Sequence, residues 1–168
     1  MHNIVNIIQR TTKYFEQQGI PSPRLETELI LCHALGYDRI ELYMNFDKPL
    51  LSSELDLLRE MVRRRAEREP LAWILGEKGF YEHDFIVQKG VLCPRPDTEI
   101  LVESVLRIIP EKEEVIIADI GCGSGCIGLS LLMAKPNTKL FAVDIAEEAL
   151  NCTRANISQF GLEKRAAV

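Results

Sequence analysis

The chain has 168 residues, of which 46% are hydrophobic and 27% are charged, and its 20 Lys and Arg against 25 Asp and Glu give a net charge of −5. This composition excludes a disordered or fibrous chain, supplies enough apolar material for a packed core and disfavours direct binding to a nucleic-acid backbone. No apolar run approaches the ~20 residues that a membrane span needs, so no membrane association is expected.

The first 77 residues are predicted to form a small all-helical domain. Apolar residues recur at helical spacing, and Gly and Pro separate the periodic segments. Helices are expected over residues 4–15, 23–35, 39–44 and 53–62, with a short turn at 71–75.

Local signals mark the ends of these helices. Ser22 before a proline resembles an N-cap, and Gly36 suits a C-cap. Ser53 with Asp56 resembles a capping box. A basic run at residues 63–68, interleaved with Glu, is interpreted as a solvated helix face, with a partner-binding patch as the alternative.

The pattern then changes, and residues 78–96 are predicted to form a β-hairpin linker. Residues 80–81 and 85–87 supply the strands, and the polar pair Glu82-His83 supplies the turn. Two prolines exclude helix at residues 94–96.

From residue 97 onward the chain alternates helices and strands, as an α/β fold does. Asp97 or Thr98 is expected to cap the first of these helices. The continuous apolar run Val115 to Ala118 predicts a strand buried on both faces. Further strands are expected at 140–143 and 166–168, and helices at 127–133 and 147–160.

The strongest sign of function is Asp119-Ile120-Gly121-Cys122-Gly123-Ser124-Gly125, between a predicted strand and a helix. Glycines allow the backbone to turn tightly and to approach a ligand closely. Unpaired N–H groups at the start of the helix favour a negative ligand group. Asp144 ends the next strand, where an acid can accept hydrogen bonds from a ribose diol.

Two nucleotide-type ligands fit such a loop. Gly123, Gly125 and Gly128 match the G-x-G-x-x-G fingerprint of dinucleotide-binding folds. That interpretation leaves Asp119 unexplained, whereas a carboxylate suits the ammonium group of S-adenosylmethionine and does little for a pyrophosphate. We therefore expect S-adenosyl-L-methionine, with NAD or a purely structural glycine turn as the alternatives.

Several segments resemble the PrmC/HemK family, protein-(glutamine-N5) methyltransferases that modify peptide chain release factors. Residues 70–76 are similar to the end of the family's helical domain, and residues 80–87 to its connecting hairpin. Leu92-Cys93-Pro94-Arg95-Pro96-Asp97-Thr98-Glu99 closely matches the family's I-P-R-P-[DE]-T-E motif. Two departures are mild: Cys93 replaces an aliphatic residue, and Trp73 stands where Tyr or His is common.

The resemblance implies a small all-α N-terminal bundle, a β-hairpin linker and the first part of a Rossmann-like α/β class I methyltransferase fold. The implied domains are 1–77 for recognition of a release factor, 78–96 as the linker and 97–168 for the partial methyltransferase domain. By the same resemblance, S-adenosyl-L-methionine is held by Asp119, Gly121, Cys122, Gly123, Ser124, Gly125 and Asp144.

The segment Arg95, Pro96, Asp97, Thr98 and Glu99 is implied to lie near the active site. Its role there is either direct contact or structural support, and Arg95 between two prolines could instead bridge the hairpin to the core by pairing with an acid.

The family's Asn-Pro-Pro-Tyr motif, which orients the glutamine amide, is absent from these residues. We therefore expect a truncated form with no catalytic residue of its own and no activity alone. In this class of fold the first strand lies between the second and the fourth, so residues 115–118 would expose an edge through which the chain associates. The alternatives are a nucleic-acid N-methyltransferase and a partner-binding module without catalysis.

Cysteine and histidine usage favours a cytoplasmic protein without a metal site. Five cysteines, an odd number with no C-x-x-C pair, are expected to remain reduced thiols. The three histidines are scattered, so no metal is expected. No secretory signal is visible at the N-terminus.

Overall fold

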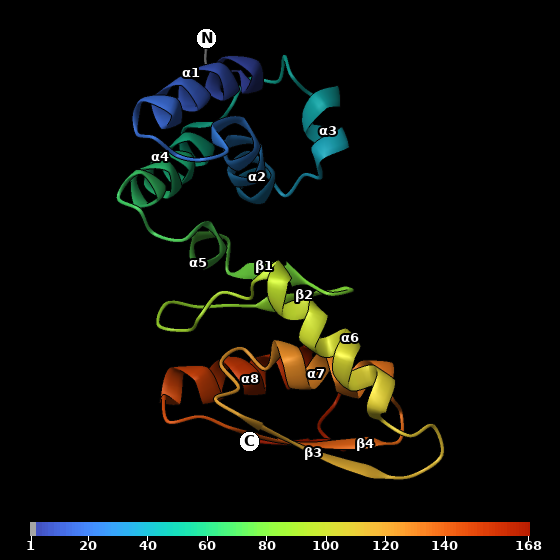
Figure 1. The fold of residues 1–168 in the computed structure, drawn as a ribbon. Helices are drawn as coiled ribbons and strands as arrows, with labels where there is room; N and C mark the ends of the chain where they lie inside the picture. Colours follow the sequence, from blue (N-terminus) through green and yellow to red (C-terminus); the bar gives the residue numbers. More distant parts are fainter. Residues whose placement is uncertain (1–2) are drawn as a thin grey trace. The chain divides into compact units, whose positions relative to one another are not determined.

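The structure is a computed structural model in which residues 3–168 are described (Figure 1). The chain falls into two compact units, one that ends at Leu75 and one that spans Gly76–Val168. Each unit buries an apolar core of its own. Within the described residues, no helix combines the length and the apolar character that crossing a membrane requires.

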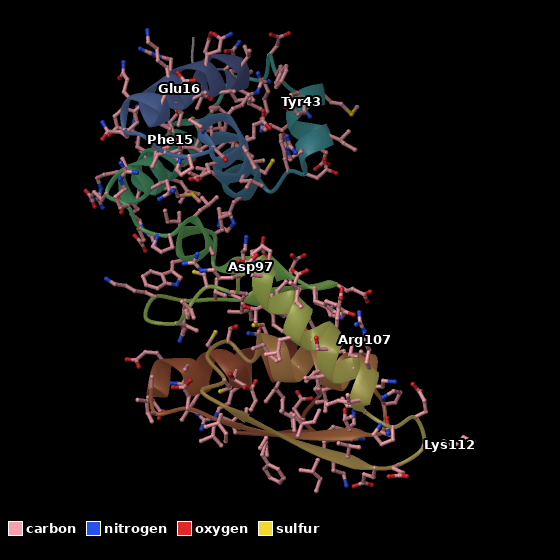
Figure 2. The ribbon with its side chains drawn as sticks, in the orientation of Figure 1. Phe15, Glu16, Tyr43, Asp97, Arg107 and Lys112 are labelled. Atoms are coloured by element: carbon pink, nitrogen blue, oxygen red, sulfur yellow. The ribbon has the colours of Figure 1, made fainter. Side chains whose placement is uncertain are left out.

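The N-terminal unit contains the four helices that the sequence predicts, and the short turn predicted at residues 71–75 is a helix as well. They are α1 (Ile4–Gln17), α2 (Pro23–Leu35), α3 (Arg39–Met44), α4 (Ser52–Ala66) and the short α5 (Leu71–Leu75). Both α1 and α4 pack against α2, and Phe15 of α1 is completely buried in the core of this unit (Figure 2). The bundle is held together by burial of the apolar stripe of each helix.

The ends of these helices only partly follow the local signals. Gly36 adopts a φ of +66° at the end of α2, as predicted. Ser22 precedes α2, but its side chain makes no capping hydrogen bond. The capping box predicted at Ser53 is wrong, because the N-cap of α4 is Leu51, two positions earlier, whose N–H donates to the Glu54 carboxylate at 2.7 Å.

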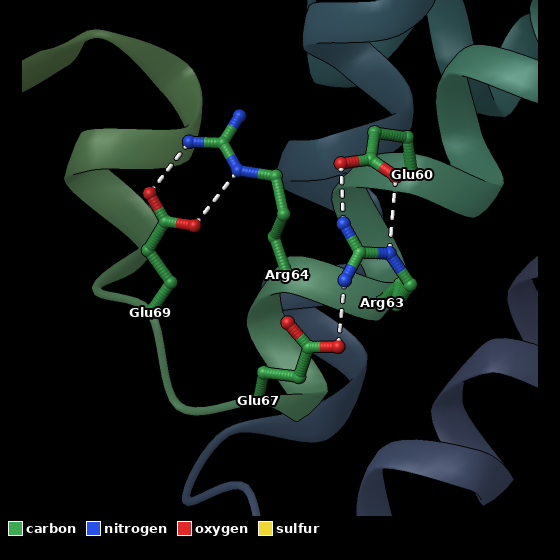
Figure 3. A network of polar contacts seen from close by, with 5 residues as sticks. All are labelled: Glu60, Arg63, Arg64, Glu67 and Glu69. Atoms are coloured by element: carbon green, nitrogen blue, oxygen red, sulfur yellow. Dashed lines mark hydrogen bonds and ion pairs between the residues drawn. The ribbon is translucent and has the colours of Figure 1, made fainter.

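The basic run of α4 is paired within the chain, as Figure 3 shows. Arg63 lies between Glu60 and Glu67, with N–O distances of 2.7 and 2.6 Å. Arg64 contacts Glu69 at 2.6 Å. These pairs support the interpretation as a solvated, self-neutralised helix face over that of a partner-binding patch.

The second unit begins with the predicted hairpin. Strand β1 (Glu77–Phe80) pairs antiparallel with β2 (His83–Ile86). The turn lies at Tyr81-Glu82 and not at Glu82-His83, because Tyr81 takes the left-handed conformation, with φ +55°. A tight turn of this hand needs a positive φ, which here falls on a tyrosine.

A single 3₁₀ turn, η1 (Pro96–Thr98), leads into α6 (Glu99–Ile108). Neither Asp97 nor Thr98 caps α6 with its side chain, so that prediction is wrong. The 3₁₀ turn takes the place of a side-chain cap, because the Thr98 N–H already bonds to the Arg95 carbonyl oxygen at 3.0 Å.

The rest of the unit is a parallel sheet with crossover helices, which confirms the predicted start of a Rossmann-like methyltransferase fold. The sheet order is β3-β4-β5, with all neighbours parallel. In chain order the elements are β3 (Val115–Ile120), α7 (Cys126–Ala134), β4 (Thr138–Val143), α8 (Glu147–Gln159) and β5 (Ala166–Ala167).

The strands are buried on one face only, contrary to the prediction for residues 115–118. Both crossovers run in the same direction across the sheet, so their right-handed connections place α7 and α8 on the same face (Figure 1). Among the described residues the opposite face carries exposed apolar side chains: Ile116, Ile120, Phe141 and Val143. Strand β3 has a neighbour on one side only within residues 3–168.

Candidate functional site

The glycine loop between β3 and α7 is held open by its backbone conformation. Gly121, Gly123 and Gly125 have φ values of +82°, +59° and +78°, which side-chain-bearing residues rarely adopt. The N–H groups of Gly121 and Cys122 both donate to the Val143 carbonyl oxygen, at 2.7 and 3.0 Å. The end of β4 therefore fixes the start of the loop.

Asp144 follows β4 and lies against this loop. One carboxylate oxygen accepts from the Ala146 N–H and the other from the Gly123 N–H, each at 3.0 Å. These two backbone hydrogen bonds lower the pKa of Asp144, so the carboxylate is ionised at neutral pH. A carboxylate oxygen has two lone pairs, so each oxygen keeps the capacity to accept one more donor, such as a sugar hydroxyl.

Asp119, the second-last residue of β3, is half-buried next to the loop. Burial raises the pKa of Asp119, the Gly128 N–H at 3.1 Å lowers it, and the Asp144 charge raises it further. A Cβ on Gly128 would come within 2.8 Å of Leu140 and 2.9 Å of the Asp119 carboxylate. Because Gly128 has no side chain, there is room for the Asp119 carboxylate beside it.

Two acidic side chains thus border one loop. A further negative group would be repelled there, whereas an ammonium group would stabilise Asp119 in its charged form. This electrostatic preference favours a ligand with a cationic part and a sugar diol over one with a pyrophosphate.

The side chains of Cys122 and Ser124 point into the protein, with 7% and 2% of their surface exposed. A ligand in the loop would therefore meet the backbone of these residues and not their side chains. Burial also raises the pKa of Cys122, and it raises the pKa of Cys126 and of Cys152 to about 11 each. None of these thiols is a nucleophile at neutral pH.

Two residues of α8 that no sequence motif singles out support the loop. The Thr153 hydroxyl donates to the Gly123 carbonyl oxygen at 3.0 Å. The Asn156 amide donates to the carbonyl oxygens of Ser124 and Ile86, each at 2.9 Å, and accepts from the Ile86 N–H at 2.7 Å. Both side chains are completely buried, and their only signal in the sequence is that they share the helical spacing of the apolar residues of α8.

The segment from Arg95 to Glu99 connects the hairpin to α6. Glu99 accepts a hydrogen bond from the Tyr81 N–H at 3.0 Å, which fixes the hairpin turn. Residues 95–97 are exposed, and no described residue pairs with the Arg95 guanidinium. The alternative that Arg95 bridges the hairpin and the core is therefore wrong, because Glu99 makes that connection.

The structure thus brings Asp119, the glycine loop and Asp144 together. No hydrogen bond or ion pair within the described part of the chain links Arg95, Pro96, Asp97 or Thr98 to them. In residues 3–168 no three His, Cys, Asp or Glu side chains are grouped so that they could hold a metal ion.

Two family models match the chain: the PrmC N-terminal domain over residues 6–76 and the methyltransferase small domain over residues 84–168. A release factor glutamine methyltransferase of Geobacter sulfurreducens is 43% identical over 158 residues, which cover 94% of this chain and 55% of that protein. One of Chlorobaculum tepidum is 34% identical over 168 residues, which cover 97% and 57%.

A bifunctional methyltransferase of Rickettsia conorii is 32% identical over 187 residues, which cover 97% of this chain and 36% of that protein. The chain spans about half the length of the release factor glutamine methyltransferases that it matches. The chain therefore belongs to the methyltransferase small domain family and carries a PrmC N-terminal domain ahead of its methyltransferase part.

Proposed function

We propose that this chain binds S-adenosyl-L-methionine and forms part of an enzyme that methylates the N5 atom of a glutamine side chain in peptide chain release factors. The observation that carries the proposal is the pairing of the Asp144 carboxylate with the Gly123 N–H at 3.0 Å. This pair creates an acidic acceptor directly beside an open glycine loop, which suits a ribose diol. The names of the relatives support the release factor as the substrate.

The donor, when bound, supplies a methyl group on a sulfonium, which is a good leaving group. The residues of this chain bind and orient it. Asp144 would accept hydrogen bonds from the ribose hydroxyls, the backbone of residues 121–125 would help to hold the donor, and Asp119 would provide negative charge for the methionine ammonium. Catalysis of this kind depends mainly on positioning the donor methyl in line with the amide nitrogen.

The group that would orient the amide nitrogen is not in these residues. The Asn-Pro-Pro-Tyr motif of the family is absent from residues 1–168. We expect the chain alone to bind the donor without transferring its methyl group, and to contribute its helical unit to recognition of the protein substrate. The segment around Arg95 is proposed to lie near the active site, where its exposed side chains are free to meet substrate.

The experiment is an NMR titration of the ¹⁵N-labelled 168-residue chain with S-adenosylmethionine and, separately, with NAD. We expect S-adenosylmethionine to shift the amide signals of residues 121–125 and 144–146, and NAD to leave them nearly unchanged. Equal shifts with NAD, or unshifted loop signals with S-adenosylmethionine, would overturn the assignment of the donor.

The substrate class has its own test. The immobilised chain is exposed to a purified bacterial release factor and to RNA and duplex DNA of similar mass, and binding is followed by interferometry. Binding to the release factor alone is expected, since the net charge of the chain is −5 and the arginines of α4 are paired internally. Preferential binding to nucleic acid would favour the nucleic-acid methyltransferase.

A further inference from the structure

The two ends of helix α4 present different surfaces. At its C-terminal end the arginines are occupied: Arg65 pairs with Glu26, and the Arg68 guanidinium donates to the carbonyl oxygens of Gln18 and Gly19. Arg63 and Arg64 pair with glutamates (Figure 3). Each of these four arginines therefore already has a partner within the described part of the chain.

The N-terminal half of α4 instead borders an open groove against α1. The groove has a volume of about 260 Å³. It exists because α1 and α4 both pack on α2 (Figure 1), so their outer faces diverge from the shared core. Its lining consists of Ile7, Arg10, Thr11, Leu55, Leu58, Arg59 and Val62.

The groove combines an apolar floor with an unbalanced positive charge. Ile7, Leu55 and Val62 are only partly buried, so the floor is accessible from the surface. Arg59 is neutralised by Asp56 at 2.6 Å. Arg10 is exposed, and no carboxylate within residues 3–168 forms an ion pair with it.

We propose that this groove docks an acidic amphipathic helix of the protein substrate, with one aliphatic side chain on the floor and a carboxylate at Arg10. The proposal rests on the proposed function in one respect, namely that the substrate is a protein. A helix that lays apolar residues into a groove is a common mode of peptide recognition, and its charges select the partner. The volume lies below the ~300–1,000 Å³ of small-molecule pockets, which favours a side chain as the occupant.

The probe is a synthetic amphipathic helical peptide of Glu and Leu, acetylated and amidated, with leucines at i, i+4 and i+7. Two matched peptides replace Leu by Ala or Glu by Lys. In the ¹³C-methyl spectrum of the full 168-residue chain, the Glu/Leu peptide is expected to shift the signals of Ile7, Leu55 and Val62. The proposal is overturned if these methyl signals stay in place, or if the Glu/Ala or Lys/Leu peptide shifts them equally.

A pair of variants on α1 tests the charge. Arg10→Glu is expected to weaken binding of the Glu/Leu peptide by about 5-fold or more, because attraction becomes repulsion. Lys13→Glu makes the same change on an exposed residue of α1 outside the groove and is expected to alter binding by less than about 2-fold. Both residues are exposed, so unchanged circular dichroism and melting temperature are expected and are checked first. Equal effects of the two variants would contradict docking in the groove.

The donor titration of the glycine loop reports on the other unit, so the two proposals fail separately. Loss of the donor response with an intact peptide response would overturn the proposed function alone. A release factor that binds wild type and Arg10→Glu equally would exclude this groove as its docking site.

Discussion

The Asp144 carboxylate, at the end of β4, accepts a hydrogen bond from the Gly123 N–H, in the loop that follows β3. The two residues are 21 positions apart in the sequence and meet because parallel strands β3 and β4 end at the same edge, with Ile120 opposite Val143. The same carboxylate therefore shapes the loop and offers its remaining lone pairs to a ligand.

Asp144→Ala is expected to weaken binding of S-adenosylmethionine by at least ~10-fold, because charged hydrogen bonds contribute roughly 1.5–3 kcal/mol each. Asp144→Asn keeps an oxygen acceptor without the charge and is expected to fall between wild type and Ala. NMR titration of the three proteins measures this order. Unchanged affinity in Asp144→Ala would remove this residue from the site.

The two acidic residues of the site are expected to affect stability with opposite pH dependence. The pKa of Asp144 is lowered in the fold, so its contribution to stability is present above its unfolded value of 3.8 and is lost as pH falls through its lower folded pKa. The pKa of Asp119 is raised, so its charged form opposes folding at neutral pH, and this penalty disappears as pH falls through its folded pKa towards 3.8.

Thermal melts between pH 3 and pH 7 test these signs. At neutral pH Asp144→Asn is expected to melt below wild type, and Asp119→Asn at or above it. Both differences should shrink in acid. Asp47→Asn, an exposed substitution in the N-terminal unit, serves as the control. Melting differences as large at pH 3 as at pH 7 would contradict the prediction.

Gly128→Ala is expected to destabilise the chain by ~1–3 kcal/mol, although Ala normally favours a helix, because its Cβ would lie within 3 Å of Leu140 and Asp119. Urea denaturation measures the change. Gly121→Ala is the comparison, since it meets no atom within 4 Å and adds only the strain of a φ of +82°. A Gly128→Ala protein as stable as wild type would show that α7 can shift away from the sheet.

Asn156→Ala is expected to lower the free energy of unfolding by ~2–3 kcal/mol, because the Ile86 N–H and the Ser124 carbonyl oxygen lose their hydrogen bonds to Asn156, and the Ile86 carbonyl oxygen keeps only the Cys152 thiol as a donor. Hydrogen exchange should become faster at the Ile86 N–H, because this group loses Asn156 as its hydrogen-bond acceptor. Asn151→Ala, on the exposed side of the same helix, is the control. Unaltered exchange at Ile86 would argue against this bridge.

The uncovered face of the sheet is expected to make the chain self-associate at high concentration. Phe141 and Ile116 are 54% and 63% exposed, and β3 has a free edge within the described residues. Phe141→Lys should restore a monomer in light scattering, whereas Leu57→Lys, at a similarly exposed position on α4, should not. A wild-type chain that stays monomeric at every concentration would refute this expectation.

The sequence by itself determined the local structure and the chemistry of the loop. Local sequence patterns located helices α1 to α4 and predicted a short turn where α5 forms, and the order of apolar run, glycines and apolar helix located the loop from Asp119 to Gly125. Such patterns involve residues that are close together in the sequence, so they can be recognised without knowledge of the fold.

Only the tertiary structure decided what lies against that loop and which surfaces remain open. Asn156 contacts Ile86 across 70 positions, and Thr153 contacts Gly123 across 30. The uncovered sheet face follows from two crossovers that turn in the same direction, and the charge balance of α4 follows from partners such as Glu26 on α2. These features depend on how distant segments pack, and a local pattern of residues does not encode that packing.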